Sequence, residues 1–161
     1  GSKVEVESEM GKGSRFYFQI NLKRASEQEL FKTTYKKEHD FKGKKVLLVE
    51  DNLINLMVAK QILEKVNLKV KVARDGLTAV KIAKKNHFDV ILMDIQMPIM
   101  DGYAASKEIR KFNKHIPIFA LSASVFLQVK SKIEESGMNG FIFKPFDPDD
   151  LLNQIENAIK S

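Results

Sequence analysis

The chain has 161 residues, 43% hydrophobic and 30% charged, which is the balance of a globular protein with room for one ordinary domain and an appendage. It has no cysteine, which excludes disulfides, thiolate metal sites and thiol nucleophiles, and no apolar run long enough to cross a bilayer. The net charge of +6 is spread along the chain and not gathered into a basic stripe, so we expect no nucleic acid partner.

The N-terminal segment alternates apolar and polar residues, as β-strands do. Residues 4–7 and 15–23 show this pattern with glycines between them, so residues 1–23 predict a β-hairpin. Its apolar residues are Val4, Val6, Phe16, Phe18, Ile20 and Leu22. Because an isolated hairpin is marginal in water, this face must pack on the rest of the chain, on another chain, or on a domain outside this sequence.

Residues 24–43 are polar and charged and lose this alternation, which predicts a linker. From residue 44 onward, short apolar runs alternate with amphipathic stretches. Strands are expected at 46–49, 69–73, 89–93, 116–121 and 140–143, and helices at 52–66, 76–86, 103–112, 125–136 and 148–159. Asp75 and Asp147 directly precede helices and are typical N-caps. Residues 44–161 therefore predict an α/β domain, a five-stranded doubly wound parallel sheet with helices on both faces.

Polar side chains follow the apolar runs at the strand ends. They are Glu50 and Asp51, Asp94, Ser122, and Lys144 followed by Pro145. In open parallel sheets, ligands bind outside the carboxyl ends of the strands, so these groups should converge. Crowded carboxylates favour a hard divalent cation such as Mg²⁺, and a carboxylate beside Mg²⁺ and an ammonium group is suited to attack phosphorus.

These residues resemble the receiver (response regulator) domain of two-component systems, and the resemblance covers essentially all of 44–160. The motifs are Glu50 and Asp51 after VLLV, Asp94 in DIQMPIMDG, Ser122 in LSAS, and Lys144 with Pro145 in FIFKP. Each motif is weak alone, but four in this order at strand ends are specific. The resemblance implies the flavodoxin-like (βα)5 receiver fold.

The resemblance also implies roles for these residues. Asp94 would be phosphorylated, Asp51 would bind Mg²⁺ directly and Glu50 through water, and the backbone carbonyl of Gln96 would be a further ligand. Lys144 would hold the phosphoryl oxygens, and Ser122 would donate a hydrogen bond to the new phosphate. Phe141 would be the switch aromatic, the peptide bond to Pro145 would be cis, and Gln96 and Ser124 would tune hydrolysis.

The hairpin, VEVESEMGKGSRFYFQINL, resembles the last hairpin of a histidine kinase ATP-binding domain over about 20 residues. The parent protein would then be a hybrid histidine kinase. This fragment lacks the rest of the nucleotide site, so it would catalyse only its own aspartyl phosphorylation and dephosphorylation. The hairpin could also join two copies as a homodimer. The three histidines have no metal-ligand spacing, and we expect surface or structural roles for them.

The function implied is that of a phosphorelay intermediate in the cytoplasm, whose parent kinase could be membrane-anchored. It would accept phosphoryl from a phosphohistidine of the sensor kinase core and pass it to a histidine phosphotransfer protein. The face of the first receiver helix near Leu53, Ile54 and Met57 borders the acidic edge, so we expect it to contact the phosphodonor helix. Two alternatives stay open: a phosphorylation-gated interaction module of the stand-alone regulator type, and a flavodoxin-like cofactor binder, against which the acidic loop after the first strand argues.

Overall fold

The computed structural model of the chain describes residues 4–19, 39–123 and 127–160, and it divides into two units, Gly1–Tyr35 and Lys36–Ser161. The predicted linker therefore lies mostly outside the described residues, as do Ile20, Leu22 and Ser124. None of the helices within these described ranges has the length and apolar character needed to span a membrane.

The first unit is an antiparallel hairpin of β1 (Val4–Glu9) and β2 (Gly13–Phe18). Gly11 and Gly13 have positive φ, which the turn requires and which glycine adopts without strain. In the strand register Val4 faces Phe18 and Val6 faces Phe16, so the four apolar side chains share one exposed face. The other face is polar, with the Tyr17 hydroxyl donating to Glu7 Oε1 at 3.0 Å.

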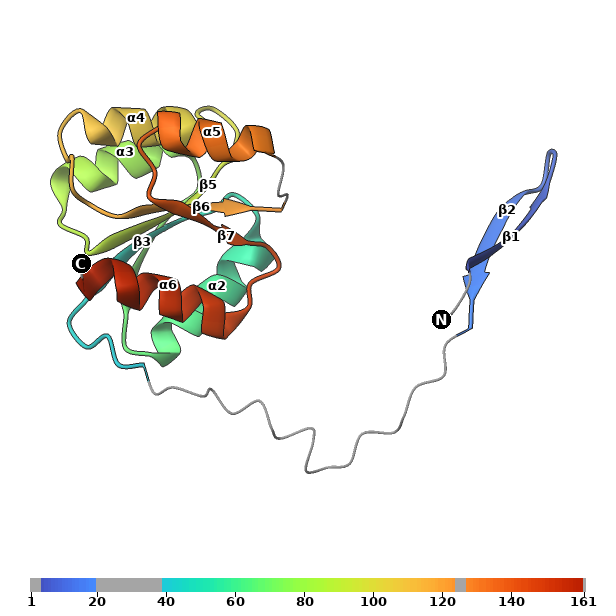
Figure 1. The fold of residues 1–161 in the computed structure, drawn as a ribbon, viewed down its shortest axis with the longest axis horizontal. Coiled ribbons are helices and arrows are strands. Elements are labelled where there is room, and N and C mark those ends of the chain that lie inside the picture. Colours follow the sequence, from blue (N-terminus) through green and yellow to red (C-terminus); the bar gives the residue numbers. More distant parts are fainter. Residues whose placement is uncertain (1–3, 20–38, 124–126, 161) are drawn as a thin grey trace, which may run out of the picture. The chain divides into compact units, whose positions relative to one another are not determined.

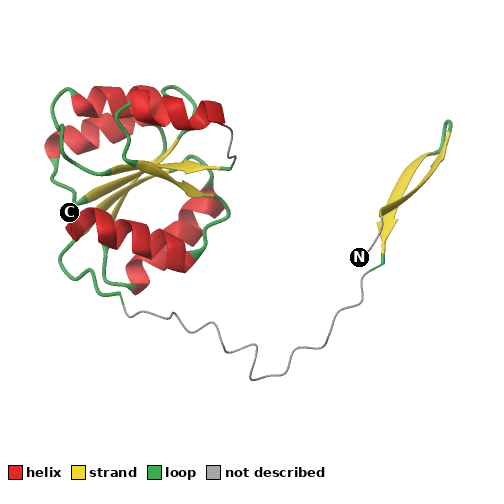
Figure 2. Ribbon diagram, in the orientation of Figure 1, coloured by secondary structure: helices red, strands yellow, loops and turns green. Residues whose placement is uncertain are grey.

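The second unit is a parallel sheet between two layers of helices, as Figures 1 and 2 show. The strands are β3 (Lys45–Val49), β4 (Lys69–Ala73), β5 (Val90–Asp94), β6 (Ile118–Ser122) and β7 (Gly140–Phe143), in the spatial order β4-β3-β5-β6-β7. The helices are α2 (Leu53–Lys65), α3 (Gly76–Lys85), α4 (Gly102–Arg110), α5 (Leu127–Glu135) and α6 (Pro148–Lys160). The predicted doubly wound, five-stranded parallel sheet is confirmed, and the hairpin is present as well.

Side chains alternate between the two faces of the sheet and build two cores. Val46 and Leu48 of β3 point into a core with α2 and α6, whereas Leu47 and Val49 point into a core with α3 and α4. The strand order reverses at β3, because β4 lies on one side of it and β5 on the other. Ligand sites of doubly wound sheets lie at this switch point, outside the carboxyl ends of the strands.

Residues 39–43, which the sequence pattern assigned to the linker, belong to the second unit, and His39 and Phe41 pack there. Phe41 is 6% exposed in the core of α2 and α6, and its N–H donates to Val66 O at 2.9 Å. The ring of His39 stacks on Phe41, and its Nδ1 lies 3.0 Å from Glu156 Oε2. Phe41 stands out in the sequence as one of the few bulky apolar residues of the linker, but a single apolar residue leaves no periodic signal that says where it packs.

Replacing Phe41 by Ala should therefore lower the free energy of unfolding of the second unit by about 3 kcal/mol, the usual cost of emptying a buried phenylalanine site. Urea denaturation followed by circular dichroism measures this change. The matched control is Phe16→Ala in the hairpin, where the ring is exposed and the urea midpoint of the second unit should not move. Equal midpoints for Phe41→Ala and the wild type would contradict the anchor.

Candidate phosphoryl-accepting site

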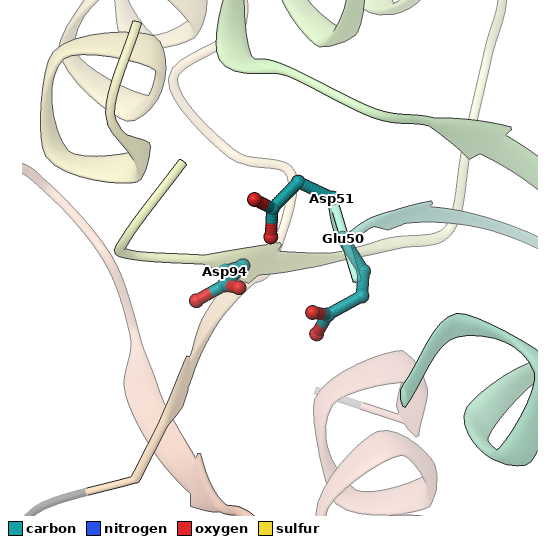
Figure 3. Close-up of side chains that lie close together, drawn as sticks. All are labelled: Glu50, Asp51 and Asp94. Carbon is teal, nitrogen blue, oxygen red and sulfur yellow. The ribbon is translucent and has the colours of Figure 1, made fainter. Parts of the chain in front are cut away.

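Three carboxylates meet at the switch point of the sheet. Glu50 and Asp51 directly follow β3, and Asp94 is the last residue of the neighbouring strand β5. One carboxylate oxygen of each lies within 4.8 Å of the others, and Figure 3 shows the three side chains directed toward a shared space. Sequence pattern placed each acid at a strand end, and the pairing of β3 with β5 brings them together.

Lys144 supplies the positive charge of this cluster. Its Nζ lies 2.6 Å from Glu50 Oε2 and 2.7 Å from Asp94 Oδ2, and the lysine side chain is only 13% exposed. The residue follows β7, whose pairing with β6 is continued by a hydrogen bond from Lys144 N to Ser122 O at 2.8 Å. The peptide bond between Lys144 and Pro145 is cis. The ammonium group therefore bridges two acids that come from different strands.

The remaining predicted residues lie at or near the ends of β5, β6 and β7, and they differ in burial. Ser122 ends β6 and is buried, whereas Gln96 is exposed and its N–H donates to Asp94 Oδ1 at 3.1 Å. Phe141 is half-buried on β7 and packs edge-to-face on Phe143, with ring centroids 4.9 Å apart. Ser124 lies outside the described residues.

Two glycines allow the loops to close around Asp94. A Cβ on Gly102 would lie 2.2 Å from Asp94 O, and one on Gly76 would lie 2.5 Å from Met100 O. Neither distance leaves room for a side chain, so the β5–α4 loop can approach the strand end only with glycine at these positions. This explains why glycine follows Asp101 in the DIQMPIMDG run.

Groups that the sequence reasoning missed also hold the acids in place. Glu50 Oε1 accepts from the N–H of Asn52 at 3.3 Å and from the side-chain amide of Asn55 at 3.2 Å. Arg74 donates from Nη2 to Asp51 O at 2.8 Å. Asn52 contributes only its main-chain N–H, which any residue type would offer, so the one available signal was the polar side chain of Asn55 on the first turn of α2.

The environment of Glu50 raises the pKa of its carboxyl above the ordinary value. Burial raises the pKa of Glu50, the nearby charge of Asp94 raises it further, and the bonds from Lys144 and Asn55 lower it. With Glu50 1% exposed and Asp94 5% exposed, the site has more negative charge than Lys144 can balance. A hard divalent cation fits this donor set, because it prefers carboxylate oxygens and would relieve their repulsion.

The pKa of Glu50 leads to a prediction about stability in chelator. A carboxyl whose pKa is raised by folding stabilises the fold fully below its unfolded pKa, about 4.3, and loses this contribution as the pH rises through the folded pKa. The free energy of unfolding of Glu50→Gln relative to the wild type should therefore increase as the pH rises above about 4.3. Urea denaturation at a series of pH values measures the difference.

The control for this prediction is Glu64→Gln, an exposed glutamate of α2. This substitution should change the free energy of unfolding by less than about 1 kcal/mol, because solvent screens an exposed pair. A constant difference for Glu50→Gln would show that burial does not perturb this carboxyl.

Comparisons with families, individual proteins and solved structures all point to one family. Residues 46–156 match the response regulator receiver domain family. The chain is 37% identical over 160 residues to hybrid signal transduction histidine kinase K of Dictyostelium discoideum, covering 92% of this chain and 13% of that protein. The chain thus spans about an eighth of the length of this relative.

Solved structures that share the fold at more than 30% identity include two receiver domains. The receiver domain of a Pseudomonas aeruginosa sensor histidine kinase, which has a magnesium ion coordinated in its active-site cleft, superposes with a TM-score of 0.70 at 36% identity, covering 74% of this chain and 99% of that chain. The receiver domain of a Saccharomyces cerevisiae response regulator, in complex with a histidine phosphotransfer protein, superposes with a TM-score of 0.68 at 34% identity. The match covers 71% of this chain and 88% of that chain.

Proposed function

This chain belongs to the response regulator receiver domain family, and from this premise we propose that it is the receiver of a hybrid histidine kinase, phosphorylated on Asp94 in a Mg²⁺-dependent phosphorelay. The observation that carries the proposal is the cluster of Glu50, Asp51 and Asp94 bridged by Lys144. Similarity to a hybrid histidine kinase over nearly the whole chain supports a parent protein of that kind. The receiver would be cytoplasmic, where ATP supplies the kinase.

The residues have distinct roles in this proposal. Asp51 and Asp94, with the Gln96 carbonyl, would hold Mg²⁺ directly, and Glu50 would act through water. When bound, the cation would neutralise charge on the transferring phosphoryl oxygens. One carboxylate oxygen of Asp94 attacks phosphorus, and the bond between phosphorus and the donor nitrogen breaks, with its electron pair returning to the imidazole. Lys144 stabilises the phosphoryl oxygens, and Ser122 donates a hydrogen bond to the product.

The direct test uses a small phosphodonor. The chain is incubated with acetyl phosphate and Mg²⁺, and intact mass spectrometry follows the addition of one phosphoryl group. We expect incorporation in Mg²⁺ and none in excess chelator. Absence of incorporation in both conditions would refute the proposal. A flavodoxin-like cofactor binder would show no incorporation, and the three acids at the strand ends would repel its phosphate-bearing cofactor.

The partner prediction concerns the exposed apolar face of α2. Leu53, Ile54 and Met57 are exposed on this helix, which begins beside the acids. The complex between a receiver and a histidine phosphotransfer protein in a relative of known structure supports the same class of partner here. Asp94 is nearly buried, so a protein that delivers a histidine to it must cover the adjacent surface.

Ile54→Glu, at a side chain that is 73% exposed, should slow transfer from a phosphorylated histidine phosphotransfer protein by about tenfold, because a charge replaces an apolar contact at an interface. The rate with acetyl phosphate should not change. Radiolabelled transfer assays measure both rates. The control is Phe112→Glu, an exposed apolar residue that follows α4, where transfer should match the wild type. Equal loss of both reactions in Ile54→Glu would contradict a docking role.

One observation favours a second function, that of a phosphorylation-gated interaction module. Phe143 is exposed on β7 and packs on Phe141, so a change in the Ser122 loop could alter an accessible aromatic surface. Return of the phosphoryl group from Asp94 to a histidine phosphotransfer protein separates the two functions. A relay intermediate passes it on, whereas a gated module keeps it until hydrolysis.

In this proposal residues 1–23 are the terminal hairpin of a kinase ATP-binding domain. A linker over 24–43 and the receiver over 44–161 follow it. Its exposed apolar face, Val4, Val6, Phe16 and Phe18, supports packing on the remainder of that domain or on a second copy as a homodimer. Sedimentation of the wild-type chain and of Phe16→Glu at several concentrations tests whether the hairpin forms a homodimer.

A further inference from the structure

The carboxylate of Glu50 is held from the start of α2 as well as by Lys144. Its Oε1 accepts from Asn52 N and from the Asn55 side-chain amide, and its Oε2 lies 2.6 Å from Lys144 Nζ. Because Glu50 is 1% exposed, solvent has little access to replace a donor that is lost. The orientation of this carboxylate therefore depends on these three groups.

The three groups contribute differently. Asn52 donates a main-chain N–H, while its side chain caps α2 by accepting from the N–H groups of Ile54 and Asn55. Lys144 divides its ammonium group between Glu50 and Asp94. Asn55 is half-buried on the first turn of α2, and its side-chain amide is directed at Glu50. Asn55 thus ties α2 to Glu50.

We propose that Asn55 is a positioning residue for the divalent-cation site, which fixes the Glu50 carboxylate so that one of its oxygens faces the space shared with Asp51 and Asp94. This inference rests on the proposed function, because it assumes that a cation binds there. Without the amide, Glu50 would sample further rotamers, and ordering it on cation binding would cost side-chain entropy. Partners that orient the direct ligands of a metal typically change its affinity by 10–100-fold when removed, and because Glu50 would act through water we expect the lower end of this range for Asn55.

The test is calorimetric titration of the chain with Mg²⁺, which reads binding without phosphorylation. In Asn55→Ala the dissociation constant should rise by about tenfold. The Mg²⁺ concentration for half-maximal phosphorylation by acetyl phosphate should rise in parallel, while the rate at saturating Mg²⁺ stays close to that of the wild type. Asn55→Gln keeps a side-chain amide and should recover most of the affinity. Thermal melting in chelator checks that each variant folds, and Asn55→Ser replaces Asn55→Ala if that variant does not.

The matched control is Gln61→Ala, which removes an exposed amide from the same helix and should leave the affinity unchanged. Wild-type affinity in Asn55→Ala would overturn the inference, and so would equal weakening in Gln61→Ala, since the effect would then belong to the whole helix. A wild-type chain that binds Mg²⁺ but accepts no phosphoryl group refutes the proposed function and leaves the inference standing. Weakening in Asn55→Gln equal to that in Asn55→Ala would refute the role of the amide.

Discussion

Asp94→Asn should abolish phosphoryl incorporation from acetyl phosphate and from a phosphorylated histidine phosphotransfer protein. An amide oxygen is a poor nucleophile and cannot form the acyl phosphate, so the loss is expected to be complete. The substitution keeps the size of the side chain and removes a charge that now raises the pKa of Glu50. The variant should therefore fold at least as stably as the wild type in chelator, and intact mass spectrometry should show a single unmodified species.

The matched control for this variant is Asp89→Asn, at the residue that directly precedes β5. Asp89 pairs with Lys44 and accepts from Lys45 N, far from the acidic cluster along β5. Its substitution should leave incorporation unchanged. Incorporation that persists in Asp94→Asn would move the phosphorylated residue elsewhere and refute the assignment of Asp94.

Lys144→Met should have two large effects. The rate of phosphorylation should fall by about a hundredfold, because a donor aimed at the charged transition state is lost. In chelator at neutral pH, the free energy of unfolding should also fall, by about 3 kcal/mol, because two nearly buried carboxylates lose their counter-ion. This destabilisation should shrink as the pH falls and Glu50 takes up a proton, and it should shrink when Mg²⁺ is added. Urea denaturation with and without Mg²⁺ measures it.

Lys44→Met is the control for the second effect, because Lys44 also pairs with an aspartate, with its Nζ 3.0 Å from Asp89 Oδ1. That pair is partly exposed, so its loss should cost less than about 1 kcal/mol and should not respond to Mg²⁺. A cost for Lys144→Met no larger than that for Lys44→Met would mean that the acids of the site do not depend on this lysine.

The order of strands and helices was predictable because its signals are local. The apolar run of β3, the caps Asp75 and Asp147, and helical spacing each act within a few residues of the chain, and the structure confirms both caps. Where boundaries differ, the cause is also local. The predicted strand from 116 begins at Ile118 in the structure, and Pro117, just before it, has no N–H for a strand ladder.

The chemistry of the site was predictable from which residue types end each strand, but its geometry was not. Sequence places Glu50, Asp94 and Lys144 on three separate segments, and no local pattern states which strands are neighbours. The parallel pairing of β3 with β5, of β5 with β6 and of β6 with β7 brings the three groups to within hydrogen-bonding distance. The same pairing buries Glu50 and so perturbs its pKa.

The sequence alone therefore determined the class of fold, the order of its elements and the acids, hydroxyl and lysine that form the site, because periodicity, caps and strand ends are encoded over short distances. The tertiary structure decided that Asn55 holds Glu50, that Arg74 holds the Asp51 carbonyl, and that Phe41 belongs to the core. These contacts depend on how α2, β4 and the segment before β3 pack against one another. Such packing is a property of the whole folded chain, because each contact is set by elements that are distant in sequence.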